Sequence, residues 1–542
     1  MWNQALTLSR ETFGDPFVAY ALNVEEKDLA ALEVSAERAD VIRILEHHAM
    51  RPVNPRSHND PSSWLWEKVP PILQSLSSLR HQCGGTPPPF ESEDEVEALL
   101  LEAVYHVWPA LLLPPPEKDS SSLRAGMQFA ILGMPINAAL GLAIVRDTDF
   151  RKIFTDDARF EALDLLEESK KLRVHTNLWW RSGQGGTTWV EAIASHLVLH
   201  GVTMAGIHDQ RTFADAARYA SAGLQIARRL AGGRQATVPL MATISNIDLG
   251  DDVDEIDTAW GKLFRPTPMS RALLREVGLW HNGSPRETTA VLASEAFDKL
   301  VCLQHRWPDV EFEDDHKWWK SYSDETNKAW TEAESMLDKL RFSLLLSSSP
   351  DSLIAAVAES ASYLNPLARS DARHLNYFVQ VFAGRTVITS SIAETVQQWS
   401  YRVKDEHPRS LETGMRRLLS AATFRLDPMD GFIDAVMCWE NLFGEAQETS
   451  FKVCGALAKL LEPNDRLRRE ALYGELKKLY DTRSKIVHGS PREPTRQSAA
   501  EHRDRAVVIA LTALRAAYEY PGLIKLGDSS ERYKQVLLEF PH

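Results

Sequence analysis

Apolar residues recur at intervals of three and four positions over many segments of this 542-residue chain. This spacing places side chains on one face of an α-helix, whereas a half-buried β-strand alternates at every second position. The segment from Phe213 to Leu230 shows the helical pattern clearly, and the glycines at 232 and 233 favour a helix end directly after it. Because alternating patterns are scarce, we predict a mostly α protein.

The same periodicity predicts further helices over residues 28–50, 93–105, 160–172, 188–200, 323–346 and 386–401. Proline-rich stretches interrupt the N-terminal half, and we expect loops there because proline fixes φ and lacks an amide donor. We find no fixed-period repeat. A helical solenoid with degenerate repeats stays open as an alternative for residues 1–310.

The length of the chain exceeds the size at which a single hydrophobic core stops growing, so we expect two or three domains. The strongest shift in composition is an acidic run at residues 308–316, ahead of the helix expected from Ser323. We therefore expect a mainly helical N-terminal region at 1–310, a helical extension at 320–426 and a helical bundle at 427–530.

Composition excludes several classes of protein. A hydrophobic content of 44% and a charged content of 25% are ordinary for globular proteins. Four scattered cysteines fit neither a zinc site nor a disulfide scaffold, and no long apolar stretch or export signal is visible. We expect a cytoplasmic protein with reduced thiols. Its net charge of −14 means that a nucleic acid would need a local basic patch.

Three patterns outside the C-terminal region suggest ligands only weakly. A glycine-rich segment at 182–188 lacks the lysine of a phosphate-binding P-loop, so we favour a flexible loop. His196 and His200 have metal-ligand spacing, but no glutamate follows the first histidine, and we favour ordinary packing. Closely spaced tryptophans, such as Trp179 and Trp180, are interpreted as packing residues because no basic run accompanies them.

One helical stripe near the C-terminus contains a charge. Leu472, Leu476, Leu479, Arg483 and Ile486 follow one another at intervals of four, three, four and three. A guanidinium in an apolar stripe costs several kcal/mol unless it is paired. Arg483 therefore requires an acid, a phosphate or an open interface.

A carboxylate interrupts a similar stripe on the preceding helix. Ile433, Val436, Glu440 and Phe443 share one face, which places Glu440 where it can orient Arg483. A purely structural ion pair between these two residues is the alternative, and it stays open.

His488 follows Arg483 by five residues. In a straight helix this separation corresponds to about 140° of rotation and about 7.5 Å of rise, so the two side chains would not converge. Gly489 and Pro491 predict that the helix ends here, and a distorted last turn or a second subunit is needed to bring the pair together. The spacing itself is uninformative, because it recurs at Arg43/His48, Arg369/His374 and Arg402/His407.

The sequence around this pair resembles a known family. Residues 479–489 (LYDTRSKIVHG) are similar to the signature of Apea-like HEPN domains, and residues 438–443 (CWENLF) are similar to the upstream helix of that family. The resemblance covers roughly residues 427–525, with a weaker extension back to about 320. It implies a compact helical bundle that dimerises and places two Arg-x4-His motifs at a shared cleft.

The resemblance also implies roles for individual residues. Arg483 and His488 are the expected catalytic residues of a metal-independent endoribonuclease without a cofactor, and Glu440, Ser484 and Lys485 are expected to support them. Imidazole suits proton transfer near neutral pH, and a guanidinium suits phosphate binding. Many ribonuclease members carry Asn, Asp or His where this chain has Ser484. Besides Arg483, ten arginines and lysines between 466 and 505 are compatible with RNA, but interleaved acids are more typical of a solvated helix surface.

We therefore expect a cytoplasmic HEPN ribonuclease of a defence or toxin system, with RNA and a second copy of the chain as partners and no membrane association. The N-terminal region would sense a trigger, bind a partner protein or restrain the nuclease. The first alternative is a non-catalytic HEPN module for dimerisation, nucleotide binding or partner binding. The second alternative is that residues 1–310 are the functional part and form a helical scaffold.

Overall fold

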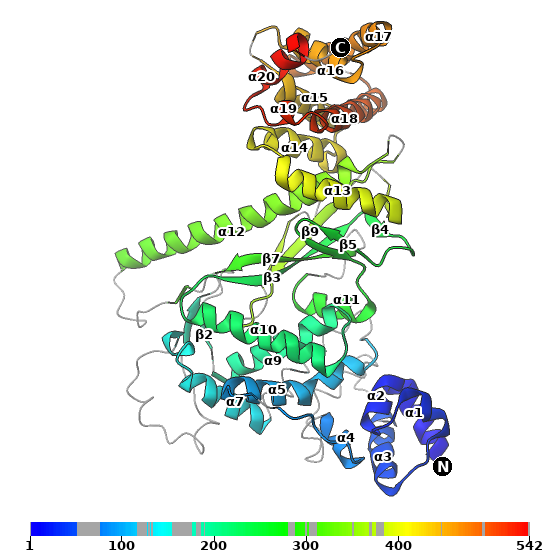
Figure 1. Cartoon of the computed structure of the whole chain (residues 1–542), viewed down its shortest axis with the longest axis vertical. Helices are drawn as coiled ribbons and strands as arrows, with labels where there is room; N and C mark the ends of the chain where they lie inside the picture. The colour runs from blue at the N-terminus through cyan, green and yellow to red at the C-terminus, as the bar shows by residue number, and fades with distance from the viewer. Residues whose placement is uncertain are drawn as a thin grey trace.

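The structure is a computed structural model. It describes residues 2–50, 76–90, 92–115, 127, 131, 134–153, 176–179, 186–188, 190–279, 288–298, 301–302, 312–349, 352–367, 371–375, 384–445, 447–489 and 494–539. Helices predominate among them, as predicted, and a sheet crosses the middle of the molecule. The molecule is elongated, with the N-terminal helices at one end and the C-terminal helices at the other (Figure 1).

Helices α5 and α7 pack against α9 and α10, whereas α1, α2 and α3 pack mainly on one another. The first turn of α10 is capped by the Thr212 side chain, which accepts a hydrogen bond from the Asp215 amide, and its amphipathic face packs against α9. Arg228 of α10 forms ion pairs with Asp94 and Asp147, and so ties α10 to α5 and α7. The elements are α1 (Trp2–Phe13), α2 (Asp15–Ala21), η1 (Glu26–Ala31), α3 (Ala36–Met50), α4 (Ser77–Gln82), α5 (Glu95–Val107), η3 (Trp108–Leu112), α7 (Pro135–Arg146), η4 (Phe150–Ile153), α9 (Val190–Ile207) and α10 (Phe213–Ala231).

An antiparallel sheet of six strands follows, in the order β10-β9-β3-β7-β6-β5. Helices α9 and α10 lie below it in Figure 1, and α12 and α13 lie above it. Its strands are β3 (Ala236–Ser245), β5 (Glu255–Thr258), β6 (Gly261–Phe264), β7 (Thr288–Asp298), β9 (Val357–Tyr363) and β10 (Asp371–His374). The smaller sheets pair β11 (Thr386–Ile388) with β4 (Ile247–Leu249), and β1 (Thr176–Trp179) with β2 (Gly186–Thr188) and β8 (Val301–Cys302).

The C-terminal helices form a bundle beyond α12 and α13. Helix α15 packs against α14, α16 and α18, and α17 packs mainly against α16 (Figure 1). The remaining elements are α11 (Pro268–Glu276), α12 (Phe312–Leu346), α13 (Ser390–Glu406), η7 (Arg409–Leu411), α14 (Glu412–Leu419), η8 (Ser420–Phe424), α15 (Pro428–Phe443), α16 (Thr449–Leu461), α17 (Arg466–Val487), α18 (Arg496–Tyr518), α19 (Pro521–Ile524), α20 (Ser529–Lys534) and η9 (Gln535–Glu539).

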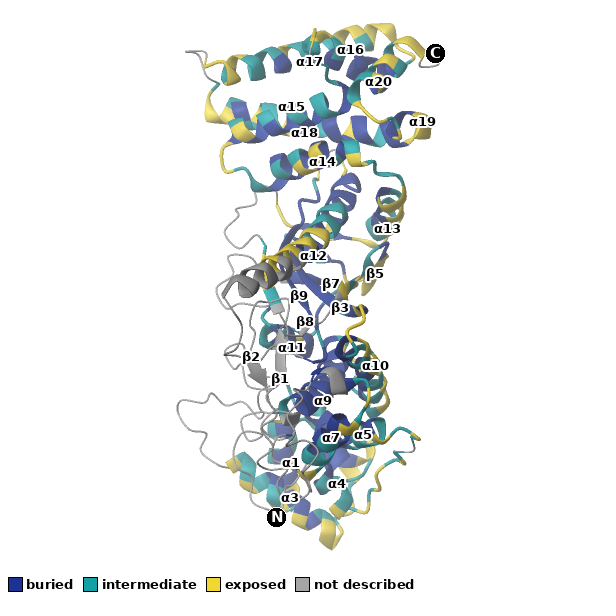
Figure 2. Cartoon of the chain, turned by 90° about the vertical axis from the view of Figure 1, so that its left-hand side faces the viewer, coloured by how far each residue is buried: buried dark blue, intermediate teal, exposed yellow. Residues whose placement is uncertain are grey.

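Two hydrophobic cores meet along α12. One core runs from Ala5 to Val396, and the other contains the bundle together with the end of α12. Leu340 and Leu344 belong to the first core, whereas Phe342 and Leu345 belong to the second. Buried residues accordingly line both the sheet region and the bundle in Figure 2.

The sheet corrects the expected division of the chain. Residues 320–426, expected to be a helical extension, contain β9 and β10, and β9 pairs with β3 so that Tyr363 lies opposite Leu240. The acidic run at 308–316 therefore does not separate two cores. Strand β9 escaped prediction because all seven of its residues are buried, including the polar Glu359, Ser360 and Ser362, so its polar side chains do not mark a solvent-facing side.

Most predicted helices are present with shifted ends, namely α3, α5, α9, α10, α12 and α13. Residues 26–31, partly inside the first expected helix, form a 3₁₀ turn, and residues 386–388 form β11 ahead of α13. The helix expected at 160–172 lies outside the described residues. Cys83, Cys438 and Cys454 are free thiols. In the part of the chain that the structure describes, none of the helices combines the length and the apolar character that crossing a membrane requires.

Candidate active site in the C-terminal bundle

Helices α15 and α17 carry the predicted site residues. Helix α15 begins at Pro428 and is capped by the Asp427 side chain, and helix α17 is capped by the Asp465 side chain. Leu476 and Leu479 of α17 are buried in the core of the bundle, which fixes the rotation of the helix. Arg483 lies on the same side, where α17 faces α15.

Arg483 and Glu440 form the predicted pair. Arg483 Nη2 donates a hydrogen bond of 3.0 Å to Glu440 Oε2, and the two side chains are only 19% and 24% exposed. Tyr480 Oη donates to the other carboxylate oxygen, Glu440 Oε1, at 2.5 Å. Burial, followed by this hydrogen bond, raises the pKa of Tyr480. Glu440 is therefore held by two donors from one face of α17.

The Arg483 guanidinium keeps unused donors. Its Nε atom is buried and has no hydrogen-bond partner within the described ranges. Its central carbon lies 6.0 Å from the centroid of the Tyr480 ring. A guanidinium with five N–H donors, one of which bonds Glu440, can still bind an anion such as a phosphate.

His488 lies at the end of α17, as predicted. Its amide bonds the Ser484 carbonyl at 3.0 Å, and Gly489 follows with a φ of 68°, in the left-handed region that ends many helices. The imidazole is exposed and has no partner among the residues that the structure describes, and no hydrogen bond joins it to Arg483. Ser484 is half-buried and Lys485 is exposed.

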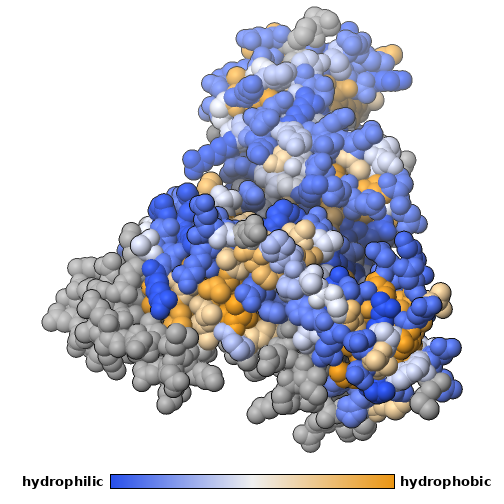
Figure 3. Space-filling model, turned by 60° about the horizontal axis from the view of Figure 1, so that its bottom comes forward, coloured by the Kyte–Doolittle hydropathy of each residue, from blue (hydrophilic) through white to orange (hydrophobic). Residues whose placement is uncertain are grey.

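Ion pairs neutralise much of the basic cluster around the site. Arg466 pairs with Glu470 at 2.8 Å, Lys477 with Asp481 at 2.5 Å, and Arg505 with Glu475 at 2.6 Å. Lys478, Lys485 and Arg496 have no ion pair in the described chain. The bundle presents a mostly hydrophilic surface at the top of Figure 3, and larger hydrophobic patches lie lower on the molecule. The cluster is thus mainly a solvated helix surface with a few free cations.

A second Arg-x4-His pair, Arg402 and His407, makes only structural contacts among the described residues. Arg402 donates to the Tyr518 carbonyl and pairs with Glu519 at 2.7 Å, and His407 Nδ1 lies 2.7 Å from Tyr518 Oη. His407 is enclosed, and burial lowers its pKa to about 4. This pair joins α13 to α18. The pair at 483 and 488 differs because its histidine is exposed and its arginine keeps a free donor.

The other candidate motifs carry no ligand set. His196 Nδ1 lies 3.2 Å from the Leu367 carbonyl oxygen, and both His196 and His200 are buried. Across the described residues, no group of three or more His, Cys, Asp or Glu side chains is placed to hold a metal ion. The loop residues 182–185, Trp64, Trp66 and Trp180 lie outside the described ranges.

Sequence reasoning missed two features. Tyr480 was part of the motif but was not assigned a role, although its position three residues before Arg483 places both on one face of the helix. A cavity between α9, α10 and the central sheet was not predicted, because its lining comes from separate segments.

Comparisons with known proteins add no assignment. Searches of protein-family models, curated proteins and solved structures find no match to this chain.

Proposed function

We propose that this protein is a HEPN-type endoribonuclease that cleaves RNA without a metal ion, using Arg483 and His488. The observation that carries the proposal is the half-buried Arg483, held by Glu440 but with a buried Nε donor unused, five residues before an exposed histidine at a helix end. An anion could accept hydrogen bonds from the donors of this guanidinium that have no partner. The resemblance of residues 479–489 to the family signature supports an RNA phosphate as that anion.

The proposed chemistry needs no co-reactant. The ribose 2′-oxygen attacks the adjacent phosphorus, the bond from phosphorus to the 5′-oxygen breaks, and the products carry a 2′,3′-cyclic phosphate and a 5′-hydroxyl. His488 takes the proton from the 2′-hydroxyl or gives one to the leaving 5′-oxygen. Arg483 binds the non-bridging oxygens and stabilises the charge that develops on them. Glu440, held by Tyr480, orients the guanidinium.

A second copy of the chain would pack at the C-terminal end of α17, where Val487 and His488 are exposed. Only three of the 22 residues of this helix are buried, and the side chains of Leu467 and Val487 are 77% and 50% exposed. Phe451 of the neighbouring helix α16 is 59% exposed. A homodimer through the C-terminal end of α17 would cover Val487 and bring two copies of the Arg483 and His488 pair to one cleft. The N-terminal region would then sense a trigger or partner protein in a cytoplasmic defence or toxin system.

Cleavage assays on the full chain test this proposal. Arg483→Ala and His488→Ala should abolish cleavage of labelled RNA in the presence of a chelator, and wild type should leave cyclic phosphate ends. Arg43→Ala and His48→Ala are the matched controls, because they have the same spacing on α3, where Arg43 pairs with Asp40 on the surface. Equal loss of activity in both sets, or no cleavage by wild type, would exclude the proposed site.

A non-catalytic HEPN module is the second candidate, and one observation favours it. Glu440 accepts hydrogen bonds from both Tyr480 and Arg483. The ion pair would therefore also stabilise the contact between α15 and α17 without any ligand. In that case Arg483→Ala would change stability or dimerisation, measured by light scattering, and RNA would remain intact with every variant.

A further inference from the structure

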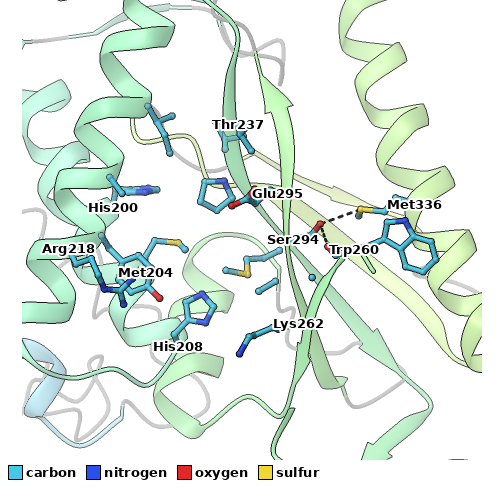
Figure 4. Close-up of a pocket in the computed structure, with 18 of the residues that line it drawn as sticks. His200, Met204, His208, Arg218, Thr237, Trp260, Lys262, Ser294, Glu295 and Met336 are labelled. Atoms are coloured by element: carbon cyan, nitrogen blue, oxygen red, sulfur yellow. Dashed lines mark hydrogen bonds between the residues drawn. The ribbon is translucent and has the colours of Figure 1, made fainter. Parts of the chain in front are cut away.

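A cavity of about 680 Å³ lies between α9, α10 and the central sheet, far along the chain from the C-terminal bundle (Figure 4). Its volume falls within the range of small-molecule binding sites, about 300–1,000 Å³. Helices α12 and α13 each contribute one lining residue, Met336 and Lys404. The cavity is therefore bounded by both helical layers of the domain and by strands of the sheet.

Regularly spaced residues on and next to α9 and α10 form one wall of the cavity. His200 and Met204 of α9, and His208 directly after its end, recur every fourth residue and project toward the strands in Figure 4. Residues 218, 222 and 226 of α10 follow the same rule. The opposite wall comes from β3, β6 and β7 and from Trp260, which lies in the turn between β5 and β6.

Apolar and aromatic side chains dominate the lining. Met204, Met241, Ile226, Tyr219 and Trp260 all border the cavity. The ring of His208, also in the lining, stacks on Tyr219 with a centroid distance of 5.7 Å and an interplanar angle of 11°. Burial, with the positive charges of Arg218 and Lys262, lowers the pKa of His208. The lining suits an apolar or aromatic body.

The charged lining residues are mostly basic. Arg218 lies 3.5 Å from Asp215, and Lys262 pairs with Glu255 at 2.5 Å, so both have carboxylate partners. Lys404 Nζ donates to the Ala259 carbonyl oxygen at 2.7 Å and has no carboxylate partner among the described residues. The ammonium group has three donors, so two remain for a ligand. Glu295 is the one acidic residue in the lining.

We propose that this cavity binds a small amphiphile with an apolar or aromatic body and a single anionic head group. The body lies between α10 and β3, and the head group, a carboxylate, sulfonate or phosphate ester, bonds Lys404. Because Arg218 and Lys262 are paired with Asp215 and Glu255, Lys404 is the lining cation that we assign to the head group. This site is independent of the proposed ribonuclease function.

Titration of the full chain with 8-anilinonaphthalene-1-sulfonate tests the site, because this fluorescent probe has an aromatic body and one sulfonate. We expect one saturable site per chain. Ala222→Trp adds bulk at an exposed helical position in the lining and should weaken binding at least tenfold. Gln225→Trp is the control, since it adds the same side chain at an exposed position of α10 outside the lining, and it should leave affinity unchanged.

Competition with matched amphiphiles tests the head group. Decanoate should displace the probe at lower concentration than decanol or decylamine. Lys404→Met should remove this preference, whereas Lys328→Met, at an exposed lysine of α12 outside the lining, should keep it. Both lysines are exposed, so neither change endangers folding, which circular dichroism will verify. Absence of a saturable site, equal effects of the two tryptophan variants, or displacement by decylamine as strong as by decanoate would overturn the proposal.

Discussion

Arg483 donates a hydrogen bond of 3.0 Å to Glu440, and this contact joins α17 to α15 near the C-terminal end of each helix. Glu440 also accepts a hydrogen bond from Tyr480, so removal of the carboxylate leaves two donors of α17 without their partner. The pair is enclosed enough for its loss to be measurable, because neither side chain is more than a quarter exposed. We therefore expect the stability of the bundle, and the proposed catalytic function, to depend on Glu440.

Glu440→Ala should lower the free energy of unfolding by about 1–3 kcal/mol, the usual cost of leaving buried polar groups unpaired. Glu440→Gln keeps an acceptor and should cost less. Urea denaturation measures both, and a double-mutant cycle with Arg483→Met should show that the two effects are not additive. If Glu440→Ala unfolds at the same urea concentration as wild type, the ion pair is not formed in solution.

His407 should make the protein sensitive to mild acid. Burial, with the positive charge of Lys339, lowers its pKa to about 4, against about 6.5 in the unfolded chain. The unfolded state therefore binds more protons between these values, and stability should fall by about 3 kcal/mol as the pH drops from 6.5 to 4. Around the ring lie Tyr518, Phe342 and Lys339.

Urea denaturation at several pH values checks this dependence. His407→Gln should flatten the pH dependence between pH 6.5 and 4, and His47→Gln, at an exposed histidine of α3, should not. An unchanged slope in the His407 variant would mean that this imidazole does not govern the acid response.

Arg341 links the two cores. This arginine is 2% exposed and donates to the Ala356 carbonyl oxygen at 3.0 Å, to Asp338 at 2.8 Å and to Thr423 of the bundle at 3.1 Å. Arg341→Met should cost about 3–5 kcal/mol, since it removes one partner from a buried network. Arg373→Met is the control, because its pair with Glu334 lies on the surface, and should cost less than about 1 kcal/mol. Chemical denaturation followed by tryptophan fluorescence distinguishes the two outcomes.

Gly261 is required by the hairpin of β5 and β6. Its φ is 133°, in a region that favours glycine, and an added Cβ would clash with the Ala293 carbonyl oxygen on β7. Gly261→Ala should lower the melting temperature by several degrees, as expected for a loss of about 1–3 kcal/mol. Gly384→Ala adds a methyl group where no atom lies within 4 Å and should have little effect. Equal melting temperatures would contradict this role for Gly261.

The sequence predicted helices well where one face meets solvent. Helix α10 has a capping threonine, an amphipathic stripe and a terminal glycine, and its observed limits, Phe213–Ala231, agree with the expected ones to within one residue. The central strands β3 and β9 lack this contrast between a buried side and a solvent-facing side. Strand β3 is buried over most of its ten residues, including the polar Thr243 and Ser245, so its polar side chains do not mark a solvent-facing side. The boundary near residue 310 could not be placed correctly from the sequence, because the pairing of β3 with β9 joins segments more than 100 residues apart.

The candidate site was predictable in part. A charge in each of two apolar stripes was enough to pair Glu440 with Arg483, because helix periodicity fixes which residues share a face. Tyr480 was missed because a tyrosine in a packed helix usually belongs to the core, and its hydroxyl partner depends on how the helices cross. The cavity between α9, α10 and the central sheet is lined by residues from separate segments, so no local sequence pattern predicts it.

A single-turnover cleavage measurement with saturating enzyme tests the central claim most directly. With a labelled RNA and a chelator present, wild type should cleave, and His488→Ala should be slower by about 10²–10⁴, the usual contribution of a general acid or base. Its affinity for RNA should stay within about twofold, because Arg483 and the nearby lysines are unchanged. The account is contradicted if the His488→Ala chain cleaves at the wild-type rate, or if wild type leaves the RNA intact.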